Sequence, residues 1–454
     1  MRIVTPPLNI QNDEGFTRDI LDRKAFADGM LNLVSRSSDE LVISLDGKWG
    51  EGKTTFVRMW QGLLSEKNIP NIYIDAFAND YVDDAFISIA SSITKYASEN
   101  IPKDKEETLK EFTGKAKKVG VQLLSWSAKV GIKAATLGAV KDSDIDELKD
   151  ISKDLAKGTS DVIGNFVEER LTSHVKDIEI FESFKSILSK IPSEISNSED
   201  KPLVIIIDEL DRCKPTYAVE VIEKVKHLFS VQKVVFVLVM HRTQLEEAVK
   251  SVYGQNIDAH TYLQKFINIE TSIPKRNGDR YTNDLKKYNQ KLMEVHEIET
   301  WGDEIHLKEG IEILACFYNL SLRQLERVYT IIAVFYASSS EQQFRLTPLI
   351  SFLSVIKVIK PILFKRLLAS DVTYLEVMEV SGLVDSSLVE NKATTINFIM
   401  DWVKFSLITT DELAALPDND RLRRFDGGRL WKYNIEREDV MPLFTQKIGM
   451  FSVV

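Results

Sequence analysis

Cysteine is almost absent from this chain: Cys213 and Cys316 are the only two among 454 residues. Two cysteines are too few for a disulfide framework or a cysteine-built zinc cluster, so we expect a reducing compartment and a cytoplasmic protein. Basic residues do not exceed acidic ones, since 58 Lys and Arg stand against 68 Asp and Glu and leave a net charge of −10. This balance argues against a general attraction to nucleic acid, although it is compatible with a local basic patch.

The chain also has no long, purely apolar run. Residues 1–22 carry four acidic side chains and lack the apolar stretch of a secretory signal. Residues 119–140 come closest to a membrane segment, but Lys129 and Lys133 lie inside them and oppose insertion. We expect a buried or amphipathic helix pair there, with attachment to a membrane or partner surface as the alternative.

What the chain does contain is a phosphate-binding pattern, G-x-x-x-x-G-K-[ST], at residues 47–54. A β-prone apolar run precedes it at 41–45, and helical spacing follows it at 54–64. Glycines let backbone N–H groups close around phosphate oxygens, and the helix N-terminus adds its positive end. Lys53 would reach the β- and γ-phosphates, and Thr54 would hold Mg²⁺. The predicted nucleotide-binding residues are Gly47, Lys48, Trp49, Gly50, Glu51, Gly52, Lys53, Thr54 and Thr55.

The remaining pattern predicts an α/β fold with a doubly wound parallel sheet. Apolar runs that predict strands lie at 40–46, 71–77, 203–209 and 233–241. Helical spacing in this part of the chain covers 16–37, 83–99 and 216–230. After Pro274 the pattern is helical, with long apolar faces at 307–316, 320–337 and 347–368.

Composition, 44% hydrophobic and 28% charged, is that of a globular chain of two or three domains. Residues 100–198 are rich in Lys, Glu, Asp and Ser and carry few strand signals. The predicted domains are residues 1–99 and 201–275 as the two parts of the core, 100–200 as a helical insertion, 276–370 as a helical lid and 371–454 as a small C-terminal region.

Two adjacent acids complete the predicted nucleotide site, because Asp208 and Glu209 end the apolar run at 203–209. A P-loop needs a carboxylate near Mg²⁺ at the end of an adjacent strand, which is the role we predict for Asp208. Glu209 would activate the attacking water as a general base. The alternative is a strand end capped by two solvated acids.

Further candidates for catalysis are a histidine and several arginines. His241 is the last residue of the predicted strand at 233–241 and would sense the γ-phosphate or orient water; a histidine without a ligand is an equal alternative. Arg323 begins an amphipathic helix, and lid domains often contribute an arginine to the nucleotide from such a place. Arg327 lies one turn further on, and the alternative for either arginine is a side chain that faces solvent. For Arg212 and Arg242 we favour structural ion pairs over charge compensation in the transition state.

Four segments together resemble the KAP family of P-loop NTPases, within the division that includes AAA+ and STAND ATPases: residues 46–54, 208–215, 262–274 and 321–327. The resemblance implies an AAA+-like parallel sheet core with a helical insertion and a C-terminal helical lid. It also implies ATP and Mg²⁺ as cofactors, with Lys53, Thr54, Asp208 and Glu209 in the roles given above.

The same resemblance bears on biology. Family members often carry transmembrane helices between the two motifs, and they commonly have an acidic residue where this chain has His241. Bacterial members occur in anti-phage defence modules such as Qat and work with other gene products. Defence is therefore the expected context, by analogy.

The leading hypothesis is an ATPase whose hydrolysis switches or drives an assembly, either a homo-oligomer or one with co-encoded proteins. The alternative is a nucleotide-gated binding module in which turnover is incidental. A membrane-attached scaffold that uses 119–140 is a third hypothesis. A nucleic-acid motor is the fourth, with a basic face built from Lys115, Lys117, Lys118 and Lys129.

Overall fold

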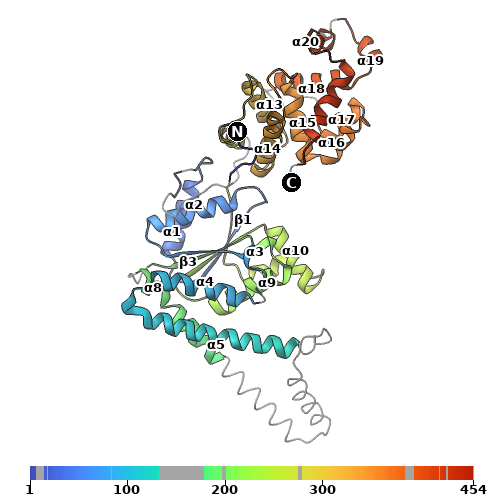
Figure 1. Ribbon diagram of the computed structural model, residues 1–454. Coiled ribbons are helices and arrows are strands. Elements are labelled where there is room, and N and C mark those ends of the chain that lie inside the picture. Colours follow the sequence, from blue (N-terminus) through green and yellow to red (C-terminus); the bar gives the residue numbers. More distant parts are fainter. Residues whose placement is uncertain are drawn as a thin grey trace, which may run out of the picture.

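The computed structural model describes most of the chain: residues 1–6, 15–17, 19–82, 84–131, 178–196, 201–274, 279–383, 393–418, 420–425 and 428–452. Its centre is a five-stranded parallel sheet (Figure 1). Across the sheet the order is β2 (Asn71–Asp75), β3 (Leu203–Asp208), β4 (Val234–Met240), β1 (Leu41–Asp46) and β5 (Ile269–Ser272). The predicted α/β fold with a parallel sheet is confirmed.

Helices cover both faces of the sheet because successive side chains of a strand point to opposite faces. In β3, Leu203, Ile205 and Ile207 join one apolar core, whereas Val204 and Ile206 join the other. The first core includes residues of α4 (Ala85–Asn100), α5 (Glu106–Gly131), α9 (Pro215–Lys224), α10 (Arg242–Tyr253) and α11 (Ala259–Gln264). The second includes residues of α1 (Lys24–Arg36) and α2 (Lys53–Glu66).

Several predicted boundaries of elements differ from the structure for local reasons. The strand predicted at 71–77 ends at Asp75, whose carboxylate accepts the N–H of Ala78 and caps α3 (Ala76–Asn79). The helix predicted at 16–37 begins at Lys24, because Asp19 accepts backbone N–H groups before it and holds a turn. The helix predicted at 216–230 is α9 followed by the π-helical turn η4 (Val225–Phe229).

The inserted region is described in two pieces. The first contains η1 (Lys103–Lys105) and α5, and the second contains a helical stretch at 178–188 and α8 (Ile191–Ser196). Residues 119–131 of the apolar segment belong to α5, and residues 132–140 lie outside the described residues. Within the part of the chain that the structure describes, no helix is long and apolar enough to cross a bilayer.

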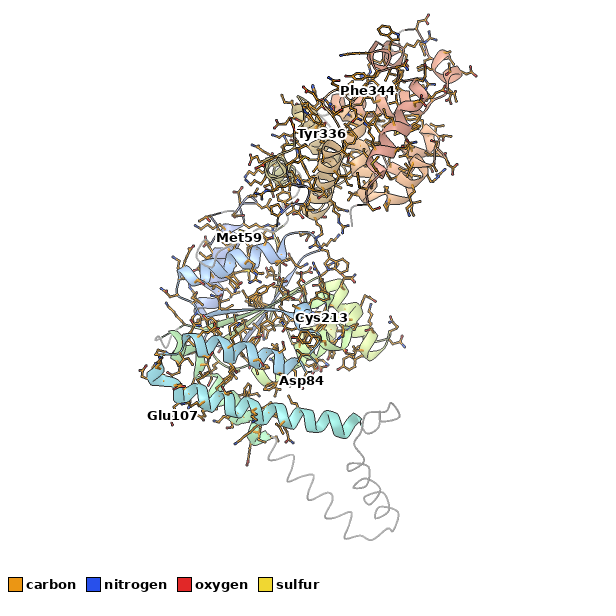
Figure 2. All side chains as sticks on the ribbon, in the orientation of Figure 1. Met59, Asp84, Glu107, Cys213, Tyr336 and Phe344 are labelled. Atoms are coloured by element: carbon orange, nitrogen blue, oxygen red, sulfur yellow. The ribbon has the colours of Figure 1, made fainter. Side chains whose placement is uncertain are left out.

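The C-terminal half is helical and shares one apolar core from Leu285 to Ile448. Figure 1 shows this part beyond α2, on the opposite side of the molecule from α5, and Figure 2 places Tyr336 and Phe344 within it. Its elements are α12 (Asp279–His296), α13 (Glu304–Phe317), α14 (Leu322–Ala337), α15 (Thr347–Ile359), α16 (Pro361–Leu368), α17 (Tyr374–Ser381), α18 (Ala393–Leu407), α19 (Thr410–Ala414), η6 (Arg421–Arg424), α20 (Gly428–Lys432), η7 (Arg437–Asp439) and α21 (Val440–Gly449).

The long helix predicted at 347–368 is two helices, since Pro361 has no N–H to continue α15 and instead begins α16. The predicted domain boundaries stay a prediction.

The first residues of the chain lie against the helical part, and we call residues 1–6 the N-terminal strap. The backbone N–H of Arg2 donates to the His296 carbonyl (2.7 Å), and the Arg2 carbonyl is 2.8 Å from His296 Nδ1. Thr5 Oγ1 lies 2.9 Å from His296 Nε2. Further along, Asp22 pairs with Lys287 of α12 at 2.6 Å. The segment before α1 therefore contacts the helical part as well as the sheet domain.

Candidate nucleotide-binding site

The predicted P-loop lies between β1 and α2, at the carboxyl edge of the sheet. Gly50 and Gly52 have φ angles of +83° and +79°, a region that favours glycine. The Gly47 N–H donates to the Met240 carbonyl (3.2 Å), which ties the loop to β4. Glu51 accepts the Lys48 N–H at 2.7 Å. The loop thus has the left-handed glycine turns and the strand-to-helix context that phosphate binding requires.

Lys53 is the first residue of α2 and is buried. Its Nζ donates to the carbonyl oxygens of Gly47 and, at 3.4 Å, Lys48. Burial lowers the pKa of Lys53, and nearby carboxylates, Asp211 first, oppose that shift. The ammonium therefore lies inside the loop, where phosphate oxygens can replace the carbonyl groups.

Asp208 is the last residue of β3 and is almost completely buried, with 1% of its surface exposed. Its carboxylate accepts hydrogen bonds from the Glu209 N–H (2.7 Å), the Tyr73 hydroxyl (3.0 Å) and the Thr54 hydroxyl. Burial raises the pKa of Asp208, and these donors oppose the shift. The two predicted metal ligands, Thr54 and Asp208, are therefore in direct contact.

Glu209 adopts a left-handed backbone conformation, with φ of +59°, which is uncommon for a residue with a side chain. It precedes the short helix η3 (Leu210–Arg212). Its carboxylate pairs with Arg212 at 2.8 Å. Burial raises the pKa of Glu209, while Arg212 and, more weakly, Arg323 lower it. In this structure the predicted base is held by an arginine from its own turn.

His241 lies directly after β4 and before α10. Its ring is 5.7 Å from the ring of Trp49, whose indole N–H donates to Asp211. The buried Nδ1 of His241 has no hydrogen-bond partner among the described residues. Trp49 of the P-loop thus contacts both the strand end and the acidic turn.

Arg242 is engaged away from the P-loop. Its side chain pairs with Glu246 (3.0 Å) and Glu270 (2.5 Å), and its backbone N–H donates to Asp46 (2.8 Å). These contacts give it the structural ion-pair role that we favoured from the sequence.

The start of α14 packs directly on the P-loop glycines. A Cβ atom added to Gly50 would lie 2.8 Å from Arg323 Cβ and 3.1 Å from Ser321 Oγ. A Cβ atom on Gly52 would lie 3.3 Å from Arg23 Nη1. Ser321 forms a capping box with Gln324, which fixes the first turn of α14 beside the loop. Arg323 is exposed at this junction.

These residues suit a nucleotide with Mg²⁺. Mg²⁺ prefers oxygen ligands and is usually held by one or two protein groups together with substrate phosphates. Thr54 and Asp208 supply a hydroxyl and a carboxylate. Within the described ranges, no cluster of three or more His, Cys, Asp or Glu forms a separate metal site.

The structure brings Lys53, Thr54, Asp208 and Glu209 together and sets His241 and Arg323 at the edge of the same site. Thr55 is exposed on the first turn of α2. The chemical roles of these residues stay predictions. The sequence interpretation did not include the hydrogen bond of Tyr73 to Asp208 or the position of Arg23 beside Gly52. No motif marks either residue.

Two solved structures are similar to the chain. The first is the Aeropyrum pernix ORC2 protein in its ADPNP–ADP complexes, with 12% identity, coverage of 99% of this chain and 98% of that chain, and a TM-score of 0.38. The second is the Walker-type ATPase paby2304 of Pyrococcus abyssi, with 11% identity, coverage of 87% and 93%, and a TM-score of 0.34. A comparison with curated proteins gives no match.

The sequence profile of the KAP family P-loop domain matches residues 23–339. The matched region begins just before α1, contains the whole parallel sheet and extends through α14. It covers well over half of the chain and includes the P-loop, the acidic end of β3 and the helix that packs on Gly50. The chain therefore belongs to the KAP family of P-loop NTPases.

Proposed function

We propose that the chain binds Mg·ATP and hydrolyses it, and that this cycle switches or drives a protein assembly. The contact between the Thr54 hydroxyl and the Asp208 carboxylate carries the proposal. It joins the P-loop to the acidic strand end, although β4 separates β1 from β3 in the sheet. A glycine turn before an ordinary helix would not need a buried carboxylate at this point.

Each residue has a defined task in this proposal. Thr54 and Asp208 would hold Mg²⁺, which would supply positive charge to offset the charge that develops on the phosphate oxygens. Lys53 exchanges the Gly47 carbonyl for phosphate oxygens, and Thr54 and Asp208 hold the metal and its water shell. Glu209 accepts a proton from the attacking water, for which its carboxylate has to turn away from Arg212.

The lid supplies the link from nucleotide to assembly. Because Arg323 and Ser321 already lie against Gly50, a phosphate group in the loop changes the surface on which α14 rests. Arg323 lies near enough to Glu209 to lower the pKa of that carboxyl. From this position Arg323 would compensate negative charge at the γ-phosphate. A rotation of the C-terminal helical part about the contact between α14 and the P-loop would be a hinge-type transition.

Phosphate release from Mg·ATP tests the proposal, together with nucleotide binding and light scattering for assembly. Lys53→Ala should abolish tight nucleotide binding. Glu209→Gln should retain binding and lose turnover by about two orders of magnitude or more, because an amide cannot accept the proton. Glu247→Gln is the matched control, since Glu247 pairs with Lys250 on the exposed face of α10. Wild-type turnover in Glu209→Gln would rule out Glu209 as the base.

A nucleotide-gated binding module is the second candidate, and the Glu209–Arg212 ion pair favours it. A base that is held by an arginine gives slow turnover until another event releases it. This candidate predicts ATP-dependent assembly in both the wild-type protein and Glu209→Gln, with little phosphate release from either.

We extend the proposal to anti-phage defence with co-encoded proteins, by analogy with other family members. Phage plating on cells that express the chain with its neighbouring genes is the direct test. Protection that is lost on Lys53→Ala would support the proposal, and equal protection with Lys53→Ala would contradict it.

A further inference from the structure

We propose that Tyr73 is a positioning residue that holds the Asp208 carboxylate in the orientation from which it binds the water shell of Mg²⁺. The inference rests on the proposed Mg·ATP function and names a residue that no motif marks. Three observations support it: the hydrogen bond from Tyr73 to Asp208, the small number of hydrogen-bond donors around the Asp208 carboxylate, and the contact of Arg58 with the Tyr73 ring.

The hydrogen bond crosses from one strand to the next. β2 is the edge strand and pairs in parallel with β3, so that Tyr73 lies opposite Ile206 and Asp75 opposite Asp208. The Tyr73 hydroxyl spans the two-residue offset and donates to Asp208 Oδ2 at 3.0 Å. The side chain is half-buried against the core beneath α2, the helix that begins with Lys53 and Thr54.

The donors around Asp208 show why this contact matters. A buried carboxylate stays charged only when donors replace the water that it has lost. The Glu209 N–H donates to Oδ1 at 2.7 Å, Tyr73 donates to Oδ2, and the Thr54 hydroxyl also donates. Of these donors, the Glu209 N–H holds Oδ1 and the Tyr73 hydroxyl holds Oδ2. Oδ2 then depends on Tyr73 for its orientation.

A residue of α2, the helix that follows the P-loop, holds the ring of Tyr73 in place. The guanidinium of Arg58 lies 3.3 Å from the ring centroid, in a cation–π contact. Arg58 also donates to Gln61 (3.2 Å), and Gln61 donates to Asn71 of β2 (3.0 Å). The hydroxyl that orients Asp208 is therefore clamped by the same helix that carries the other predicted metal ligand.

Tyr96 of α4 provides a matched control. Its hydroxyl accepts the backbone N–H of Asn71 at 3.3 Å, so it too supports β2 through a hydrogen bond. Burial raises the pKa of both Tyr73 and Tyr96, so both hydroxyls stay protonated. Tyr96 has no hydrogen bond to Asp208, and a purely structural role would make the two tyrosines equivalent.

The test measures binding of a fluorescent ATP analogue to the full chain, first in EDTA and then over a Mg²⁺ titration. For Tyr73→Phe we expect Mg²⁺-free affinity within about twofold of wild type and a roughly tenfold higher Mg²⁺ concentration at half-saturation, the effect of one hydrogen bond to a charged group. Tyr96→Phe should change neither value. Asp208→Asn sets the scale for complete loss of the carboxylate.

Two results for a folded Tyr73→Phe would overturn the inference. One is a Mg²⁺ half-saturation equal to that of wild type. The other is an equal loss of affinity with and without Mg²⁺, which would mean a general structural role. If wild-type binding itself does not depend on Mg²⁺, the proposed function fails, and this inference fails with it; the wild-type titration separates that case from the first two.

Discussion

At the scale of single residues, Gly50 is constrained twice. Its φ of +83° disfavours any side chain, and a Cβ atom there would lie 2.8 Å from Arg323 Cβ. Gly382 has a similar φ of +75° but has nothing within 4 Å of an added Cβ. The two glycines therefore separate backbone strain from contact between the loop and the lid.

We predict that Gly50→Ala and Gly382→Ala each destabilise the fold by about 1–2 kcal/mol, because both force an L-residue into a left-handed conformation. Gly50→Ala alone should also weaken nucleotide binding by roughly tenfold or more, since α14 has to move off the loop. Thermal unfolding and a nucleotide titration measure the two effects. Equal nucleotide affinity in both variants would show that the contact with Arg323 does not matter for binding.

A single functional residue can be predicted from the sequence when it is part of a recognisable sequence pattern. A glycine loop and an acidic strand end have recognisable patterns, which is why the sequence predicts Lys53, Thr54, Asp208 and Glu209, and the structure places these four residues together. Tyr73 was hidden inside an ordinary β-prone run. Its contact with Asp208 depends on the pairing of β2 with β3, which is a property of the sheet and not of the local sequence.

At the scale of elements, buried strands were the easiest to predict. β3 and β4 are entirely buried and read as continuous apolar runs. β5 was not predicted, because its four residues alternate between half-buried and exposed and include Glu270, Thr271 and Ser272. It is an edge strand, and pairing with β1 rather than an apolar sequence defines it.

The capping box at the start of α14 gives a prediction about an element. Ser321→Ala removes the side chain that accepts the Gln324 N–H, and we expect a loss of about 1 kcal/mol of stability. ATP turnover should also fall several-fold, because Arg323 is in the turn that loses its cap. Denaturant unfolding and phosphate release are the measurements.

Thr409 caps α19 with an equivalent capping box, in a helix that belongs to the C-terminal part of the chain. Thr409→Ala should cost similar stability and leave turnover unchanged. A parallel loss of turnover in both variants would mean that stability alone, and not the position of Arg323, explains the Ser321 result.

At the scale of the whole molecule, the N-terminal strap connects distant parts of the chain through His296. This residue is fully buried, its ring lies 5.8 Å from that of Tyr329, and both ring nitrogens have partners in the strap. Burial lowers the pKa of His296, while the Arg2 carbonyl and Glu326 of α14 oppose the shift. The neutral ring is therefore the form that fits between strap and helices.

The sign of the pH effect follows from this. A histidine with a lowered pKa in the folded state binds fewer protons than it does in the unfolded chain, so its contribution is complete above about pH 6.5 and is lost as pH falls below that value. We predict that wild-type stability falls more steeply than that of His296→Gln between about pH 7.5 and 5.5. Thermal midpoints across this range test it, and parallel curves would contradict it.

Domain organisation was only partly accessible from the sequence. After residue 99 the described elements are helices until β3, and after Pro274 they are all helices. The predicted domain boundaries themselves stay a prediction. The apolar core shared from Leu285 to Ile448 joins helices from both sides of residue 371, and such long-range packing leaves no local signal in the sequence.

The position of β4 between β1 and β3 has a consequence for biosynthesis. β1 pairs only with β4 and β5 among the described strands, and both come far later in the chain. At 5–20 residues per second, the roughly 190 residues between β1 and β4 take about 10–40 s to translate. Throughout that time β1 has no partner strand, and β2 can pair with β3 only near its end, because β3 is made shortly before β4. A nascent chain therefore acquires its ATP site late, in one step, when β4 inserts.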